Sequence, residues 1–363
     1  MNKNGYNLAL CGYGAIGKGV VKIVNSLPSS LNIKMTKVLD KEEKREELGE
    51  LFVPSYLDIT LDPTIDVVFE AMGGDAFAYI CIKSALENGK SVITSNKETV
   101  SKHLDEYLSL AKQNNCYFLF EASVGGGIPL IYTLLEICDY DHINRIQGIL
   151  NGTTNYILTR VIYDNLSFED ALKEAQKKGY AEANPDADIN GADLARKGAI
   201  LASLAFNKII DVNEVKTYGL QYLNQKVIDE IQKMNKVLKY VVDAKRVGED
   251  ISLSIMPTLI NEEHAFESIK YETNGVVLSC EFNDDVVLIG KGAGQLPTAS
   301  SMIQDLFRVI KGNGEIERKN VSKATLLPPP DNNYLVLDKN GDVFIKYLNS
   351  FELDDYPFIA RII

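Results

Sequence analysis

The sequence predicts an α/β protein with two domains: a doubly wound parallel sheet at the N-terminus, and an α+β domain with a mostly antiparallel sheet. Near the N-terminus, short buried strands alternate with helical apolar patterns, as in parallel sheets. Further along, a succession of short strands indicates antiparallel pairing. The 363 residues, of which 45% are hydrophobic, provide enough length and apolar material for two cores.

Composition excludes several classes of protein. The formal net charge is -12 and the chain has no basic block, so we expect no nucleic-acid partner. No apolar run reaches the roughly 20 residues of a membrane span, and the N-terminal segment lacks the features of a signal peptide. The 5 cysteines form no CxxC pair, which favours reduced thiols in a cytoplasmic protein. The 3 histidines lack metal-ligand spacing, which argues against a transition-metal site.

A glycine-rich turn follows the first predicted strand, Tyr6–Cys11, and precedes a helix. In this context GxGxxG predicts a Rossmann-type dinucleotide site rather than a plain strand-to-helix turn. The first glycine permits the tight turn, the second lets the backbone approach a pyrophosphate, and the third lets the helix pack on the strand. The candidate cofactor-binding residues are Gly12, Tyr13, Gly14, Ala15, Ile16 and Gly17.

An acidic residue ends the second predicted strand, Ile33–Leu39. Asp40 stands close to the position, about 20 residues beyond the glycines, where an acid binds the ribose 2′-hydroxyl of NAD. The basic residues that follow Asp40 leave NADP open. The charged run after Asp40 is otherwise a solvated surface segment.

Two more strand ends are predicted to face the cofactor, because ligands of doubly wound sheets lie at the carboxyl ends of the strands. Gly73 follows the strand predicted at 66–71, and Ser95 and Lys97 follow the strand predicted at 91–94. The alternative for Lys97 is a surface lysine that begins a helix.

Two further loops allow more than one interpretation. In EASVGGGIP (121–129) the glycines leave backbone carbonyls available for a monovalent cation, although chemistry alone favours a tight crossover between domains. In NGTTN (151–155) small hydroxyls and N–H groups precede a helix, so the segment is either a carboxylate cradle or a Thr N-cap.

The segment 179–197, GYAEANPDADINGADLARK, concentrates the chemistry. It carries four carboxylates, those of Glu182, Asp186, Asp188 and Asp193. They need a cationic partner, which could be the segment's own lysine, a metal or a substrate amino group. Asp193 and Lys197 share one helical face, and the helix that follows is apolar nearly all round. We therefore expect a buried Lys197, although a surface ion pair is the alternative.

Beyond residue 206 we expect a helix over 227–240 and strands that include 244–247, 251–258, 268–273, 275–281 and 285–289. A second glycine loop, GKGAG (290–294), precedes a helix, an arrangement suited to an anion or cofactor. Asn340-Gly341 predicts a hairpin.

In this order the motifs resemble homoserine dehydrogenase, over most of the chain from GYGAIG to about Ile310. The most specific segments are GILNGTTNYIL, GYAEANPDADINGADLARK and GKGAGQLPTAS. This family reduces L-aspartate 4-semialdehyde to L-homoserine reversibly with NAD(P)H, on the route to threonine and methionine. The resemblance thus implies an NAD(P)-dependent oxidoreductase acting on a CH–OH group of a small molecule.

The resemblance also implies roles for particular residues. Lys197 would be the catalytic lysine, with Lys97 as the second active-site lysine. Glu182 and Asp193, with Asp188 beside them, would hold the substrate's amino group. Gly152 and Thr153 would receive its carboxylate, and Gly294 would contact the nicotinamide nucleotide. The resemblance implies a site for Na+ or K+ formed by the backbone carbonyls of Glu121, Val124, Gly126 and Ile128.

The implied organisation is a dinucleotide-binding domain over 1–134 that is completed by about 290–318, a substrate-binding and catalytic domain over 135–289, and a short C-terminal extension over 319–363. The tail is too short for the regulatory ACT domain that many relatives carry. The resemblance further implies a homodimer formed through the sheet of the substrate domain. Leu39 stands where many relatives have a basic residue, so a preference for NADP does not follow.

Two alternatives to this function stay open at this point. One is another amino-acid-related NAD(P) dehydrogenase. The other is a non-catalytic NAD(P)-binding sensor, which would have no reason to keep both lysines together with the carboxylates.

Overall fold

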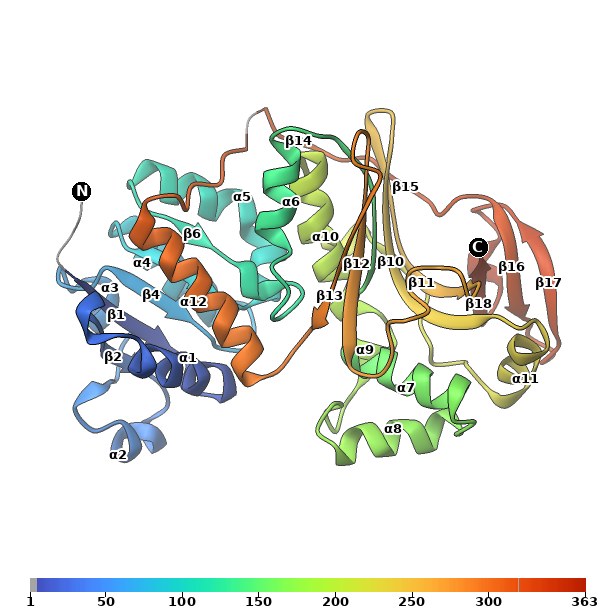
Figure 1. The fold of residues 1–363 in the computed structure, drawn as a ribbon, viewed down its shortest axis with the longest axis horizontal. Coiled ribbons are helices and arrows are strands. Elements are labelled where there is room, and N and C mark those ends of the chain that lie inside the picture. Colours follow the sequence, from blue (N-terminus) through green and yellow to red (C-terminus); the bar gives the residue numbers. More distant parts are fainter. Residues whose placement is uncertain (1–4, 319) are drawn as a thin grey trace. The chain divides into compact units, whose positions relative to one another are not determined.

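The computed structural model describes residues 5–318 and 320–363. The protein consists of two compact units, each made of two separate stretches of the chain (Figure 1). The first unit comprises Met1–Tyr132 with Ala293–Asn320, and the second comprises Thr133–Gly292 with Val321–Ile363.

The first unit contains a parallel sheet of six strands in the order β3-β2-β1-β4-β5-β6. The strands are β1 (Tyr6–Cys11), β2 (Ile33–Leu39), β3 (Phe52–Val53), β4 (Val67–Glu70), β5 (Ser91–Thr94) and β6 (Phe118–Leu119). The strand order reverses between β1 and β4, and doubly wound folds bind their ligands at the carboxyl ends of such strands. The predicted Rossmann-type sheet is therefore confirmed.

The helices of this unit pack in neighbouring pairs. They are α1 (Ala15–Ser26), α2 (Arg45–Leu48), α3 (Leu57–Thr60), α4 (Ala76–Glu87), α5 (Lys97–Gln113) and α12 (Gln295–Lys311), while α6 (Ile131–Cys138) continues into the second unit's sequence. Figure 1 shows α12 alongside α1, although they lie far apart in the sequence. Gly19 permits this approach, because a Cβ there would lie 2.9 Å from the Gln295 carbonyl oxygen. The returning segment is thus packed into the first unit.

The second unit contains a mixed sheet of ten strands, with the main path β13-β12-β7-β10-β11-β18-β16-β17. The strands of that path are β7 (Ile143–Ile149), β10 (Val237–Val247), β11 (Asp250–Ile260), β12 (Thr273–Cys280), β13 (Asp285–Lys291), β16 (Asn332–Leu337), β17 (Val343–Leu348) and β18 (Phe358–Ile362). Pairing is antiparallel from β13 to β11, whereas β18 and the short strands β9 (Lys216–Thr217) and β15 (Leu326–Leu327) run parallel to β11. The predicted mostly antiparallel sheet is confirmed.

The helices of the second unit include the segments that carry the candidate catalytic residues. They are α7 (Gly152–Tyr163), α8 (Phe168–Lys177), α9 (Asp186–Ile189), α10 (Ala192–Phe206) and α11 (Gln225–Lys233). A separate pair of short strands, β8 (Lys208–Ile209) and β14 (Ser322–Lys323), runs parallel. α10 is buried along most of its length, as its apolar sequence predicted.

Two expected elements are wrong. Residues 227–240 do not form one helix, because α11 ends at Lys233 and β10 begins at Val237. Asn235 between them has a left-handed φ of 52°, which ends the helix. The strand expected at 268–273 is also absent up to residue 272, where the chain turns and Tyr271 has a φ of 55°, and β12 begins only at Thr273. In both places local spacing did not reveal a turn at a residue with a positive φ.

The hairpin predicted at Asn340-Gly341 is confirmed, since β16 and β17 pair antiparallel and Gly341 has a φ of 84°. β18 then returns beside β11 and carries the buried Arg361. The Arg361 Nη2 lies 2.7 Å from Oδ2 of the buried Asp243 on β10. The segment after residue 320 is therefore part of the second unit's sheet.

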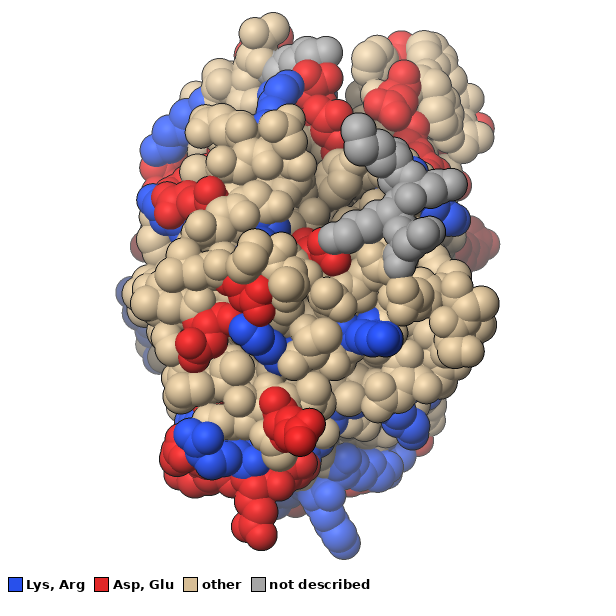
Figure 2. Space-filling view, turned by 90° about the vertical axis from the view of Figure 1, so that its left-hand side faces the viewer, with Lys and Arg blue, Asp and Glu red and all other residues tan. Residues whose placement is uncertain are grey.

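The cysteines are free, and all are buried except Cys138, which is half-buried. Among the described helices, none has both the length and the apolar character required to cross a bilayer. Figure 2 shows Lys and Arg scattered among Asp and Glu on the face it presents, rather than gathered into one broad basic surface.

Candidate active site

The glycine turn between β1 and α1 has the geometry of a phosphate-binding loop. Gly12 has a φ of 100° and donates its N–H to the Leu39 carbonyl (2.9 Å). A Cβ on Gly17 would lie 2.0 Å from the Gly12 carbonyl oxygen, so α1 can begin only with glycine there. A Cβ on Gly14 would meet nothing within 4 Å. The open side of this turn, at the N-terminus of α1, is where a pyrophosphate would approach the backbone.

Asp40 closes one side of this turn. Its carboxylate accepts the backbone N–H of Tyr13 and, at 2.7 Å, that of Lys41. Two basic residues that could bind the 2′-phosphate of NADP form surface ion pairs instead: Lys44 with Glu47 and Arg45 with Glu42. The contact between strand end and glycine turn suits recognition of a ribose hydroxyl.

The carboxyl ends of β4 and β5 are joined through a buried acid. Glu70 is 1% exposed and accepts the Met72 N–H (2.7 Å) and the Thr94 hydroxyl. Burial raises the pKa of Glu70 to about 7. Asn96 donates its side-chain amide to the Gly74 carbonyl (2.7 Å) and caps α5. These bonds hold the loop of Gly73 beside the segment that carries the half-buried Ser95 and Lys97.

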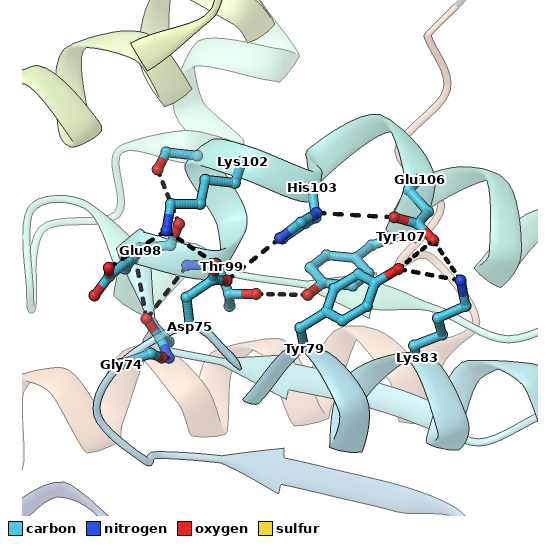
Figure 3. Close-up of polar contacts among 12 residues, drawn as sticks. Gly74, Asp75, Tyr79, Lys83, Glu98, Thr99, Lys102, His103, Glu106 and Tyr107 are labelled. Atoms are coloured by element: carbon cyan, nitrogen blue, oxygen red, sulfur yellow. Dashed lines mark hydrogen bonds and ion pairs between the residues drawn. The ribbon is translucent and has the colours of Figure 1, made fainter. Parts of the chain in front are cut away.

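A polar network continues from this loop along α4 and α5 (Figure 3). His103 lies between Asp75 and Glu106, with nitrogen–oxygen distances of 3.3 and 3.8 Å. Asp75 also pairs with Lys102 (2.9 Å), while Glu106 accepts from Lys83 (2.8 Å). Asp75 directly follows the glycine loop, so the network couples the starts of α4 and α5 next to the candidate cofactor residues.

The EASVGGGIP loop is clamped from two sides within the first unit. The Glu121 carboxylate does not point to solvent: it accepts the N–H groups of Leu130 (2.6 Å), Ile131 (2.9 Å) and Tyr132 (3.0 Å) at the start of α6. On α12, Asp305 accepts the Glu121 N–H (3.0 Å) and Ser301 donates to the Gly126 carbonyl (2.7 Å). Burial raises the pKa of Asp305, and the charge of Glu121 adds to the rise.

These contacts bear on the expected cation site. Carbonyl oxygens are suitable ligands for a hard cation, and Glu121, Val124, Gly126 and Ile128 are all buried. Ser301 already occupies one of the two lone pairs of the Gly126 carbonyl, which leaves the other available. The hydrogen bond from Ser301 thus leaves the Gly126 carbonyl able to accept a further ligand. No group of three or more His, Cys, Asp or Glu side chains in the described chain offers a metal site of another kind.

In the second unit, Lys197 is held as predicted on the buried face of α10. Its side chain is 12% exposed, and its Nζ lies 2.8 Å from Asp193 Oδ2 and donates to the Leu150 carbonyl (2.6 Å). Asn151 donates its side-chain amide to Asp193 (2.9 Å) and to Asp188 (2.6 Å). The structure thus brings Lys197, Asp193 and Asp188 into one hydrogen-bonded cluster, and the surface-pair alternative is wrong.

The NGTTN segment joins the same cluster at the start of α7. The residue that caps α7 is Asn151, which accepts the Thr154 N–H (2.8 Å). The Thr153 hydroxyl donates to the Tyr180 carbonyl (2.5 Å), so it ties α7 to the acidic segment. At Gly152 a Cβ would lie 2.9 Å from the Glu272 carbonyl oxygen, which explains the glycine. The helix N-terminus remains suited to a carboxylate.

Two predicted residues lie outside these groups. Glu182 is exposed, and its backbone carbonyl accepts a hydrogen bond from the Gln176 side-chain amide (3.1 Å). Gly294 caps α12 with a φ of 119° in the first unit. Reasoning from sequence missed Asn151, Glu70 and Asp305. Only Asn151 had a signal, because Asn is a preferred N-cap residue.

Comparisons with known proteins agree with this geometry. The family model for the homoserine dehydrogenase NAD binding domain matches residues 12–121, and the homoserine dehydrogenase model matches 129–307. Homoserine dehydrogenase of Bacillus subtilis (strain 168) is 38% identical over 314 residues, or 84% of this chain and 72% of the relative. Homoserine dehydrogenase of Synechocystis sp. is 33% identical over 362 residues, or 96% and 83%.

Among solved structures, a homoserine dehydrogenase from Thiobacillus denitrificans has a TM-score of 0.86 at 30% identity, covering 92% of this chain and 84% of that one. Fold and site define an NAD(P)-dependent oxidoreductase that acts on a CH–OH group. The relatives described above are homoserine dehydrogenases, and the chain belongs to the homoserine dehydrogenase family.

Proposed function

We propose that Lys197 is the proton donor and acceptor in the interconversion of L-aspartate 4-semialdehyde and L-homoserine, as a step towards threonine and methionine. One observation carries this proposal. The Lys197 ammonium is nearly buried, yet a carboxylate and a carbonyl hold it at 2.8 and 2.6 Å. A lysine fixed in this way can give its proton to an alkoxide without reorganisation.

The cofactor supplies the hydride that reduces the aldehyde carbon. Lys197 protonates the oxygen that becomes the hydroxyl, and in the reverse direction it accepts that proton. Lys97, at the N-terminus of α5, adds positive charge near the developing alkoxide. Asp193, Asp188 and Glu182 attract the substrate's ammonium group, while Gly152 and Thr153 at the start of α7 bind its carboxylate.

The remaining assignments follow the two units. Gly12–Gly17, Asp40, Gly73, Ser95, Lys97 and Gly294 bind NAD(P), and the EASVGGGIP loop binds Na+ or K+. The enzyme acts in the cytoplasm, which the free cysteines support.

The enzyme forms a homodimer through the sheet of the second unit. Supporting this, the edge strand β13 exposes Val287 (42%) and Ile289 (53%). Sedimentation velocity of Val287→Lys against wild type tests the dimer: equal masses would contradict it.

The role of Lys197 is tested by homoserine oxidation at alkaline pH. Lys197→Ala should lower kcat by roughly 10²–10⁴-fold, the usual contribution of a general acid–base group. Lys173 on α8 provides a control, since its side chain is 75% exposed and Lys173→Ala should keep wild-type turnover. NADH binding, followed by nicotinamide fluorescence, should survive in both variants. Wild-type turnover in Lys197→Ala would exclude the proposed role.

A further inference from the structure

Asn151 uses every hydrogen-bonding position of its side chain. It is 5% exposed and lies between β7 and α7. Its Oδ1 accepts the Thr154 N–H (2.8 Å) and the Thr154 hydroxyl (3.0 Å). Its Nδ2 donates one hydrogen to Asp188 Oδ1 (2.6 Å) and the other to Asp193 Oδ2 (2.9 Å). The amide orientation is therefore determined, because a flipped amide would turn its oxygen towards two carboxylates.

The two N–H bonds of this amide join carboxylates that would otherwise repel each other. Asp193 in turn pairs with Lys197. Leu150, which precedes Asn151 in the chain, accepts a hydrogen bond from the same lysine through its backbone carbonyl. Leu150 and Asn151 together thus fix Lys197 from two directions, one directly and one through Asp193.

The neutral amide also fits the charge of the cluster. A carboxylate in place of the amide would add negative charge beside two acids, and a cation would reduce the negative charge that attracts a substrate ammonium. Only a neutral residue with two donors satisfies both acids without changing that charge.

We propose that Asn151 is a positioning residue of the reaction, which holds Asp188 and Asp193 for the substrate ammonium and thereby orients Lys197. This rests on the proposed role of Lys197. Asn151 does not itself transfer a proton. The competing role is purely structural: Asn151 also caps α7, and a cap alone would affect folding but not the chemistry.

Two variants separate the roles. Asn151→Asp and Asn151→Ser both keep an oxygen that can cap α7, since Asn, Asp and Ser are comparably good caps. Both lose the two N–H bonds to the acids. Asn224, which caps α11 by accepting the Val227 N–H (3.2 Å), provides matched controls in Asn224→Asp and Asn224→Ser.

We expect kcat for homoserine oxidation to fall by roughly 10–100-fold in both Asn151 variants, because small displacements of catalytic groups have effects of this size. KM for homoserine should rise as well, since the acids that hold the ammonium lose their alignment. In Asn151→Asp the added negative charge should raise the pKa of Lys197. The part of the pH–rate profile in which kcat rises with pH should therefore shift to higher pH by about one unit. The Asn224 variants should retain wild-type constants and pH profile.

The outcomes are distinguishable. Wild-type kcat, KM and pH profile in both Asn151 variants, with Lys197→Ala inactive, would overturn the positioning role alone. So would a change confined to the thermal midpoint, with kcat, KM and the pH profile as in wild type, which would leave Asn151 a purely structural role. An active Lys197→Ala would instead overturn the proposed function of the cluster. If Asn151→Ser fails to fold, the nearly isosteric Asn151→Asp decides through its pH profile.

Discussion

Replacing Glu70 by glutamine should change how the stability of the first unit depends on pH. The carboxyl group is 1% exposed, and burial raises its pKa from 4.5 to about 7. A carboxyl group whose folded pKa exceeds its unfolded pKa stabilises the protein fully below pH 4.5. That contribution is lost as the pH rises through 7. Glutamine keeps the shape of Glu70 but does not titrate.

The size of the effect follows from the two pKa values. A difference of roughly 2.5 in pKa corresponds to about 3 kcal/mol over the whole titration. Between pH 5 and pH 9 the wild type should lose about 2.5 kcal/mol relative to Glu70→Gln, because part of the titration lies below pH 5. For a unit of this size that is a Tm difference of roughly 5–10 °C.

Thermal scans by far-UV circular dichroism at several pH values would measure this difference, since the chain has 0 tryptophans to report by fluorescence. Glu50→Gln is the control, because Glu50 is exposed in the same unit. The Tm of Glu70→Gln minus that of wild type should increase steadily with pH, while that of Glu50→Gln stays constant. Parallel curves for all three proteins would refute the reasoning.

Two other predictions concern the cofactor unit. Gly17→Ala should lower the Tm of this unit, since a Cβ there would lie 2.0 Å from a backbone oxygen. Gly14→Ala should keep the wild-type Tm and weaken NADH binding. Equal Tm values for the two variants would contradict this prediction. Asp40→Ala should lower kcat/KM for NADH by roughly tenfold or more, as loss of a charge-assisted hydrogen bond does, and affect NADPH less. An unchanged NADH-to-NADPH ratio would show that Asp40 does not contact the ribose.

Local signals were sufficient for much of the first unit. β1, β2 and β5 begin and end where the sequence predicts them, because glycine or polar residues bound each strand. The error at 227–240 has a different cause. Apolar residues continue from α11 into β10, so the pattern shows burial on both sides of the turn at Asn235 without showing that the period changes.

The candidate site likewise contains one contact that the sequence predicts and others that it does not. Asp193 and Lys197 are four apart on a helix, so their pairing followed from sequence spacing. The Leu150 carbonyl and the Asn151 amide reach Lys197 and Asp193 only because β7 and α10 meet in the folded second unit.

Sequence could identify Asn151 as a cap, since its oxygen bonds within its own helix, but its Nδ2 bonds to distant acids. When a residue has both local and distant partners, the sequence reveals only its local, structural role. For that reason the Asn151 variants that keep the cap are more informative than its replacement by alanine, which would remove both sets of bonds together.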